Sequence, residues 1–164
     1  MRFFIIIFFL FSFVSLSNAQ SNNEYRDNTL SFELGKTGLI YNLNFDHKFL
    51  NKDFGVRLNV GSNFAKYLNA FTAGGGVYYL FGKNKNFLET GIDLNYLSVD
   101  EVSKDQKGVA LIYPDYSINT LYTSVNIGFR KYGKTGLFRI GISPGFIKDG
   151  FVPGGYMSYG FTFK

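Results

Sequence analysis

The feature that most constrains this fold is a strict alternation of apolar and polar residues. In the segment YMSYGFTF, residues 156–163, every second residue from Met157 onward is large and apolar. Successive side chains of a β-strand point to opposite faces, so this period of two indicates a strand with one apolar face. The pattern recurs along the chain and predicts eight strands. Their expected ranges are 29–35, 38–48, 54–62, 71–81, 87–98, 119–130, 136–144 and 155–163.

The first 19 residues have the three parts of a secretory signal peptide. Arg2 supplies a positive charge, residues 3–14 form an apolar run, and Ser17-Asn18-Ala19 is a small-residue cleavage site. An uncleaved anchor is the weaker alternative, because a membrane-spanning helix needs about 20 apolar residues. We therefore expect cleavage after Ala19, a short segment at 20–28 and one domain at 29–164. The chain has no cysteine, so packing and hydrogen bonds alone must hold the exported domain together.

Alternation leaves open which face of the strands points inward. In a soluble exported barrel the apolar face would line the interior and the polar face would meet water. In a membrane barrel the apolar face would contact lipid and the polar face would line the bore. Most of the expected strands approach the roughly 9 to 11 residues that a tilted membrane strand needs, which is compatible with the second arrangement.

The lengths of the connections favour the membrane arrangement. Outer-membrane barrels of bacteria have short turns on the periplasmic side and longer loops outside. Counted back from the C-terminus, the expected periplasmic turns are residues 132–135, 82–86 and 49–53. The opposite side would receive the longer connections 145–154, 99–118 and 63–70. The first connection, GKTG at 35–38, is the exception because it is short and would lie outside.

With these features the chain resembles the small eight-stranded outer-membrane β-barrel proteins of Gram-negative bacteria. The resemblance rests on the leader, the strand count, the motif SFELG…GLIYNLNF near the start and FRIGISPGF…PGGYMSYGFTF at the end. It implies an all-β, eight-stranded antiparallel up-and-down transmembrane barrel, surrounded by outer-membrane lipid and monomeric or weakly associating. The final FTFK, with Phe161 and Phe163, is close to the terminal aromatic signature that the outer-membrane assembly machinery reads, displaced by one lysine.

Charged residues on the polar face are expected to form a buried network. An eight-stranded barrel has an interior just wide enough for side chains to fill, and buried charges there must be paired. Glycines on the same face would make room for long Arg and Tyr side chains. A filled bore argues against a wide diffusion channel. The residues expected in the network are Glu33, Arg57, Glu89, Asp93, Arg130 and Arg139.

One motif would suggest nucleotide binding if it stood in another context. GFRKYGKT, residues 128–135, fits the phosphate-loop template G-x-x-x-x-G-K-[ST]. A phosphate loop requires a following helix whose N–H groups cradle the phosphates, whereas here one alternating strand ends and another begins. We therefore expect a hairpin turn and no nucleotide. The net charge of +5, one unit lower without Arg2, is scattered among acids, so nucleic acid is not expected either.

The single histidine, His47, is the only candidate base for a lipid-modifying barrel enzyme. By its parity it lies on the apolar face, near the periplasmic end of its strand, whereas an enzyme acting on surface lipid needs its base at the outer leaflet. Phe49 occupies the position where such enzymes usually have a serine. We interpret His47 as structural and expect neither enzymatic activity nor a cofactor.

The longest connection, 99–118, is where we expect recognition, because function often lies on loops of a rigid scaffold. The alternative is that it extends two strands as a hairpin above the membrane. Its acidic residues lack the spacing of a cation-binding loop, so no metal is expected. The candidate contact residues are Asp100, Glu101, Lys104, Lys107 and Tyr113.

These observations favour a non-enzymatic integral outer-membrane protein with a structural or surface-contact role through its loops. Two alternatives remain at this point. One is a membrane-embedded lipid-modifying enzyme or narrow channel, and the other is a soluble exported barrel with an apolar ligand cavity.

Overall fold

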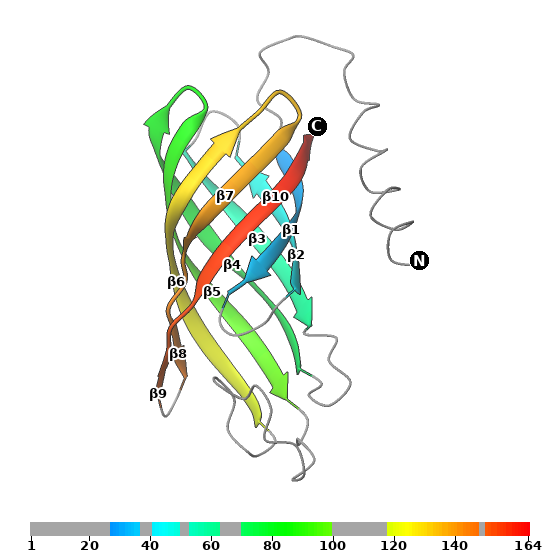
Figure 1. Cartoon of the computed structure of the whole chain (residues 1–164), viewed down its shortest axis with the longest axis vertical. Helices are drawn as coiled ribbons and strands as arrows, with labels where there is room; N and C mark the ends of the chain where they lie inside the picture. Colours follow the sequence, from blue (N-terminus) through cyan, green and yellow to red (C-terminus); the bar gives the residue numbers. More distant parts are fainter. Residues whose placement is uncertain (1–26, 37–40, 50–52, 63–69, 100–117, 148–149) are drawn as a thin grey trace, which may run out of the picture.

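The computed structural model describes residues 27–36, 41–49, 53–62, 70–99, 118–147 and 150–164 (Figure 1). Within these ranges no helix has the length and hydropathy that crossing a bilayer requires. All regular structure there is β. The strands are β1 (Asn28–Gly35), β2 (Tyr41–Lys48), β3 (Phe54–Ser62), β4 (Ala70–Lys83), β5 (Asn86–Val99), β6 (Ile118–Tyr132), β7 (Gly136–Ile142), β8 (Gly145–Ile147), β9 (Gly150–Val152) and β10 (Gly155–Phe163).

Eight of these strands form a closed antiparallel wall. Neighbouring strands follow the order β5-β4-β3-β2-β1-β10-β7-β6, and pairing between β5 and β6 closes the barrel. Every pairing joins wall strands that are consecutive in the chain, apart from β1–β10, which joins the first wall strand to the last. The predicted eight-stranded up-and-down barrel is therefore confirmed. Its short turns, β4–β5 and β6–β7, lie at the same end as the C-terminus (Figure 1), which we call the turn end; the opposite end is the loop end.

The predicted loop at 145–154 is wrong in part, because it contains β8 and β9. The register between β7 and β10, with Ile142 opposite Gly155, continues unchanged into β8 and β9, with Gly145 opposite Val152. This places Pro144 opposite Pro153 at the interruption. Proline has no N–H group and so removes a ladder hydrogen bond. Ser143 N still donates to Gly154 O over 2.8 Å, so residues 136–147 and 150–163 form one long hairpin.

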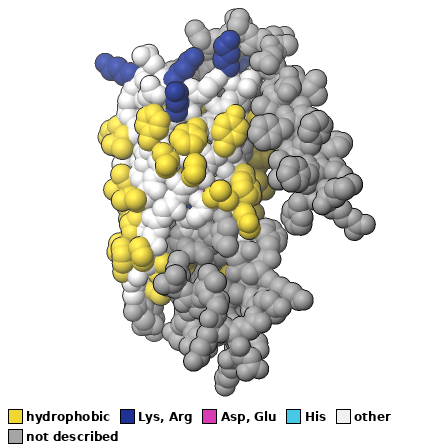
Figure 2. Space-filling model, in the orientation of Figure 1, with side chains coloured by type: hydrophobic (Ala, Val, Ile, Leu, Met, Phe, Trp, Pro, Cys, Tyr) yellow, Lys and Arg dark blue, Asp and Glu magenta, His cyan; other side chains and the backbone are white. Residues whose placement is uncertain are grey.

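Burial alternates along the wall strands, and the apolar face points outward. In β3, for example, exposed and buried residues alternate from Phe54 to Gly61, with Leu58 61% exposed and Arg57 only 1% exposed. The exposed apolar side chains of the wall strands, which we call the apolar belt, are spread over the visible face of the barrel below its lysine-rich end (Figure 2). Since a water-soluble fold would bury these side chains and expose the charges, this inversion indicates that the wall is built to face lipid.

The interior has an apolar cluster near each end. At the turn end the cluster contains Tyr78, Leu80, Phe87, Tyr132 and Leu137. At the loop end it contains Ala70, Leu97, Val99 and Tyr122. Polar and charged side chains fill the space between the two clusters.

Candidate functional site in the bore

Next to the apolar cluster of the turn end, the bore holds three arginines and three acids, which we call the charge layer. The arginines come from β3, β6 and β7, and the acids from β1, β2 and β5, so the layer ties together strands from around the wall. All six side chains are at most 1% exposed, and their formal charges cancel. The members are Glu33, Asp46, Arg57, Glu89, Arg130 and Arg139.

Glu89 is the centre of the charge layer because it accepts hydrogen bonds from all three arginines. Arg57 donates to its Oε1 over 2.7 Å and Arg139 donates to the same oxygen over 2.8 Å. Arg130 donates to Oε2 through its Nε. Hydrogen bonds of this charge-assisted kind are the strongest that side chains make. One carboxylate thus compensates part of the charge of three guanidinium groups.

The remaining acids complete the compensation. Asp46 accepts from Arg57 Nε over 2.8 Å and from Arg130 Nη2 over 2.6 Å. Glu33 accepts from Arg139 Nη1 over 3.3 Å. Two polar atoms, Glu33 Oε1 and Arg57 Nη1, have no hydrogen-bond partner within the described part of the chain. The layer is therefore charge-balanced, with Glu33 as its most weakly held acid.

Two tyrosine rings support the guanidinium groups. The Tyr78 ring lies 4.3 Å from the Arg130 Cζ and 5.3 Å from the Arg57 Cζ, measured to the ring centroid. The Tyr156 ring lies 4.9 Å from the Arg139 Cζ. Desolvated contacts of a cation with an aromatic face are attractive. The tyrosines therefore help to hold the arginines in a layer that excludes bulk water.

Glycines on the facing strands give these rings their space, as the sequence pattern predicted. A Cβ added to Gly55 would lie 2.4 Å from the Tyr78 hydroxyl and 2.4 Å from the His47 carbonyl oxygen. At Gly128 it would lie 2.4 Å from the Tyr156 hydroxyl. Neither position has room for a side chain while the tyrosine keeps its place.

Asp93 belongs to a separate polar cluster on the loop side of the charge layer. Lys36 donates to it, and Asn126 Nδ2 donates to it over 2.8 Å. Ser143 Oγ in turn donates to Asn126 Oδ1 over 2.7 Å. Lys36 has a φ of 70°, which is uncommon for a residue with a side chain. Although the sequence groups Asp93 with the arginines, its ion-pair partner is this lysine, from what the sequence predicted to be a turn.

Four further buried residues, which we call the asparagine layer, lie on the loop side of the residues described so far. Asn44 and Asn59 follow Asp46 and Arg57 by one inward position, and Asn95 and Ser124 follow Asp93 and Asn126 by one inward position. Asn44 and Asn95 have neither side-chain oxygen nor side-chain nitrogen paired among the described residues. Asn59 Nδ2 and Ser124 Oγ are likewise unpaired there. Buried polar groups normally have a hydrogen-bond partner, so this layer differs sharply from the charge layer beside it. The members are Asn44, Asn59, Asn95 and Ser124.

Sequence reasoning left Asp46 and Lys36 out of the network. A signal for Asp46 existed, because it shares the polar face of its strand with Asn42 and Asn44. Its role depends on the register that places it opposite Arg57, which a sequence pattern does not supply. Lys36 carried no signal, since the residue lies at the end of its strand in a turn-like GKTG motif.

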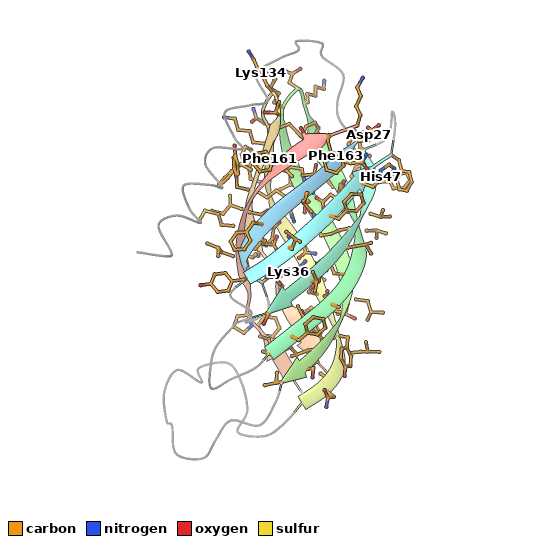
Figure 3. All side chains as sticks on the ribbon, turned by 90° about the vertical axis from the view of Figure 1, so that its right-hand side faces the viewer. Asp27, Lys36, His47, Lys134, Phe161 and Phe163 are labelled. Atoms are coloured by element: carbon orange, nitrogen blue, oxygen red, sulfur yellow. The ribbon has the colours of Figure 1, made fainter. Side chains whose placement is uncertain are left out.

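The other predicted residues lie on the outside or beyond the described ranges. Phe161 and Phe163 are exposed on β10 near the turn end, and His47 lies near the same end (Figure 3). The His47 Nδ1 lies 2.9 Å from the Asn28 Oδ1. The His47 ring packs edge-on against the Phe49 ring, with the two ring centroids 5.2 Å apart. The candidate loop residues between Asp100 and Tyr113 fall outside the described residues, as do the acidic residues of that connection.

The nucleotide-like motif forms a hairpin. Gly128 to Tyr132 ends β6, and β7 begins at Gly136, so a strand and not a helix follows the glycine-lysine pair. Gly133 N donates to Gly136 O over 2.6 Å, which closes the turn. Among the described residues no group of three or more His, Cys, Asp or Glu side chains is arranged to hold a metal.

A closed eight-stranded barrel with lipid-suited walls and a charge-balanced bore defines a class of protein, the small membrane β-barrel. No protein-family model matches the sequence, and no curated protein matches it. Among solved structures, the chain is similar to the N-terminal β-barrel domain of Pseudomonas aeruginosa OprF, with a TM-score of 0.68 and 12% identity over 85% of this chain and 100% of that one. It is also similar to Ail, the attachment invasion locus protein of Yersinia pestis, with a TM-score of 0.52 and 12% identity over 85% of this chain and 99% of that one.

At this level of identity the likeness is one of fold. The fold is that of the small eight-stranded outer-membrane β-barrels of Gram-negative bacteria, as the sequence resemblance predicted.

Proposed function

We propose that this protein is a non-enzymatic, integral outer-membrane β-barrel that acts as a sealed structural element and presents its loops for surface contact. The observation that carries the proposal is the inversion of the wall, with apolar side chains outside and the charge layer inside. The similarity in fold to OprF and Ail supports the same class. Export through a leader cleaved after Ala19, and insertion with the turn end toward the periplasm, are parts of this proposal.

A closed bore follows from the same geometry. The charge layer is buried inside the barrel, and each ionised group in it has a partner of opposite sign. Hydrated ions would have to displace these pairs, and the penalty for leaving a buried charge unpaired is several kcal/mol. The arrangement therefore favours a structural barrel over the narrow-channel alternative.

Surface contact is assigned to the loop end. The long hairpin of β7 to β10 carries two exposed aromatic side chains there, Phe146 and Phe151, whose ring centroids are 5.6 Å apart. The segment 99–118, with Asp100, Glu101, Lys104, Lys107 and Tyr113, stays our candidate for recognition. Replacing residues 100–116 with a short Gly-Ser turn should leave the barrel folded and abolish surface binding. Loss of folding would make the segment part of the wall instead.

Electrophoresis tests the membrane proposal directly. A closed barrel satisfies its backbone hydrogen bonds internally, so the folded protein should resist SDS at room temperature and migrate differently after boiling. It should also remain with membranes through salt and alkaline washing. Identical migration before and after heating, with the protein in the soluble fraction, would overturn the assignment. Stepwise ion conductance across planar bilayers would overturn only the sealed bore and favour a narrow channel.

Assembly is proposed to depend on the C-terminal aromatic residues. Phe161 and Phe163 are exposed on the last strand, at 39% and 41%. Replacing Phe163 with Ala should lower the amount of heat-modifiable protein in cells while leaving refolding of the purified chain in detergent unchanged. Equal loss in both experiments would indicate a structural role.

A further inference from the structure

Exposed lysines gather at the turn end of the barrel. Lys83 and Lys85 belong to the β4–β5 turn region, and Lys131 and Lys134 belong to the β6–β7 turn region. These four residues, which we call the lysine rim, are all exposed. Figure 2 shows basic side chains beyond the apolar belt at this end, and Figure 3 shows Lys134 at the tip. None of the four forms an ion pair with another described residue.

Strand register places two of these lysines in a row with an amide side chain between them. Lys83 is directly opposite Asn86, and Asn86 is directly opposite Lys131. Neighbouring strands are about 4.8 Å apart, so the two lysine backbones are separated by roughly 10 Å across the three strands. Asn86 is exposed as well. The row therefore offers two cations and one amide donor on the same stretch of the outer wall.

The row continues the face that points toward lipid. Lys83 follows Phe81 by two residues on β4, and Lys131 follows Phe129 by two residues on β6. Both phenylalanines are exposed, at 52% and 42%, and Phe81 packs against Tyr79 with ring centroids 4.6 Å apart. Two residues of a strand advance by about 6.7 Å. The two lysines thus follow directly after exposed phenylalanines at the edge of the apolar belt.

We propose that the lysine rim binds the phosphate of anionic phospholipids in the leaflet at the turn end, with Lys83, Asn86 and Lys131 contacting the headgroup. Lysine stems cover apolar surface while their charged heads reach the polar interface, and each such lysine attracts anionic lipid. Lys85 and Lys134 at the turn tips add longer-range attraction. The inference rests on the proposed function, because it requires the apolar belt to be embedded in a bilayer.

The proposal can be tested directly by measuring lipid selectivity. The mature chain is folded into phosphatidylcholine vesicles, and spin-labelled phosphatidylglycerol is compared with spin-labelled phosphatidylcholine in the motionally restricted shell around the barrel. For the native protein we expect a preference for phosphatidylglycerol over phosphatidylcholine. Each lysine removed in K83Q/K131Q should lower this preference about five-fold. The preference should weaken at high ionic strength, because exposed charges are screened.

A charge-conserving variant is the matched control. K83R/K131R keeps both cations on the same wall positions, so it should retain the preference. K85Q/K134Q removes the same amount of charge from the turn tips, and it should lower the preference for phosphatidylglycerol less than K83Q/K131Q does. Preference that survives K83Q/K131Q, or a native barrel that binds both lipids equally, would overturn the inference.

The outcomes also separate this inference from the proposed function. A heat-modifiable barrel inserted in vesicles without lipid preference would overturn the lysine rim alone. Failure of the native chain to insert would overturn both. Co-sedimentation with isolated peptidoglycan that depends on Lys83 and Lys131, together with equal lipid binding, would assign the rim to the cell wall and also overturn the lipid proposal.

Discussion

The charge layer and the asparagine layer lie in the same bore, but their buried polar groups differ in whether they have partners. In the charge layer each guanidinium and each carboxylate has an oppositely charged partner. In the asparagine layer, Asn44 and Asn95 are as deeply buried, at 0% and 1% exposed, yet their amides have no partner among the described residues. The contrast shows which kind of polarity this interior must pair and which it tolerates.

The physical reason is the difference in the penalty for burial. An unpaired charge in a medium of low dielectric is far less favourable than an unpaired neutral amide. An amide can also accept one or two ordered waters in place of protein partners. Pairing in the charge layer is therefore a condition for folding, whereas the asparagine layer leaves room at a modest cost in free energy.

Replacing Glu89 with Ala tests this comparison most strongly. The change leaves three guanidinium groups with only Asp46 and Glu33 as acids, so we expect a loss of stability of about 5 kcal/mol. The measurement is the urea dependence of the heat-modifiable gel band for barrels folded in vesicles. Glu89→Gln keeps the shape of the side chain, and its loss of stability should be slightly smaller. Asn95→Ala, at a position that is buried to a similar extent, should lower the stability by about 1 kcal/mol. Equal losses in Glu89→Ala and Asn95→Ala would break the distinction between the layers.

Replacing Arg139 with Ala should have a smaller but still large effect. Glu89 keeps two arginines, whereas Glu33 loses its ion-pair partner within the described structure. We expect destabilisation of about 3 kcal/mol, measured by the same urea titration. Arg139→Lys retains the charge without the guanidinium fork, so its stability should lie between that of Arg139→Ala and that of the native protein. An unchanged unfolding midpoint for Arg139→Ala would show that the arginine is not buried in the layer.

Replacing Asn95 with Leu should have the smallest effect and sharpens the comparison. Because the amide makes no hydrogen bond with a described residue, an apolar side chain of similar volume should be neutral or stabilise the barrel by up to about 1 kcal/mol. The matched control is Asn126→Leu. Asn126 is equally buried but donates to Asp93, so its loss should destabilise by about 1 to 3 kcal/mol. A similar loss for Asn95→Leu would show that this amide has essential partners, with ordered water as the first candidate.

Much of the wall could be predicted because its pattern is local. The alternation in residues 156–163 assigns each side chain to a face without knowledge of any partner. Strand ends were less predictable, because β4 and β5 extend to Lys83 and Asn86 at a tight turn. The hairpin of β8 and β9 was missed because Pro144 and Pro153 interrupt the alternation, although the register shows that pairing resumes beyond them.

The sequence by itself determined the number of wall strands, the two faces of each strand and most of the charged residues that share the bore, but not Lys36. These follow from a two-residue period, which depends only on backbone geometry. The tertiary structure alone decided which charges meet, because pairing depends on register and on closure between β5 and β6. Asp46 meets Arg57 across one strand pair, but Glu89 reaches Arg139 only because the sheet curves around and shortens the distance between strands that are not neighbours.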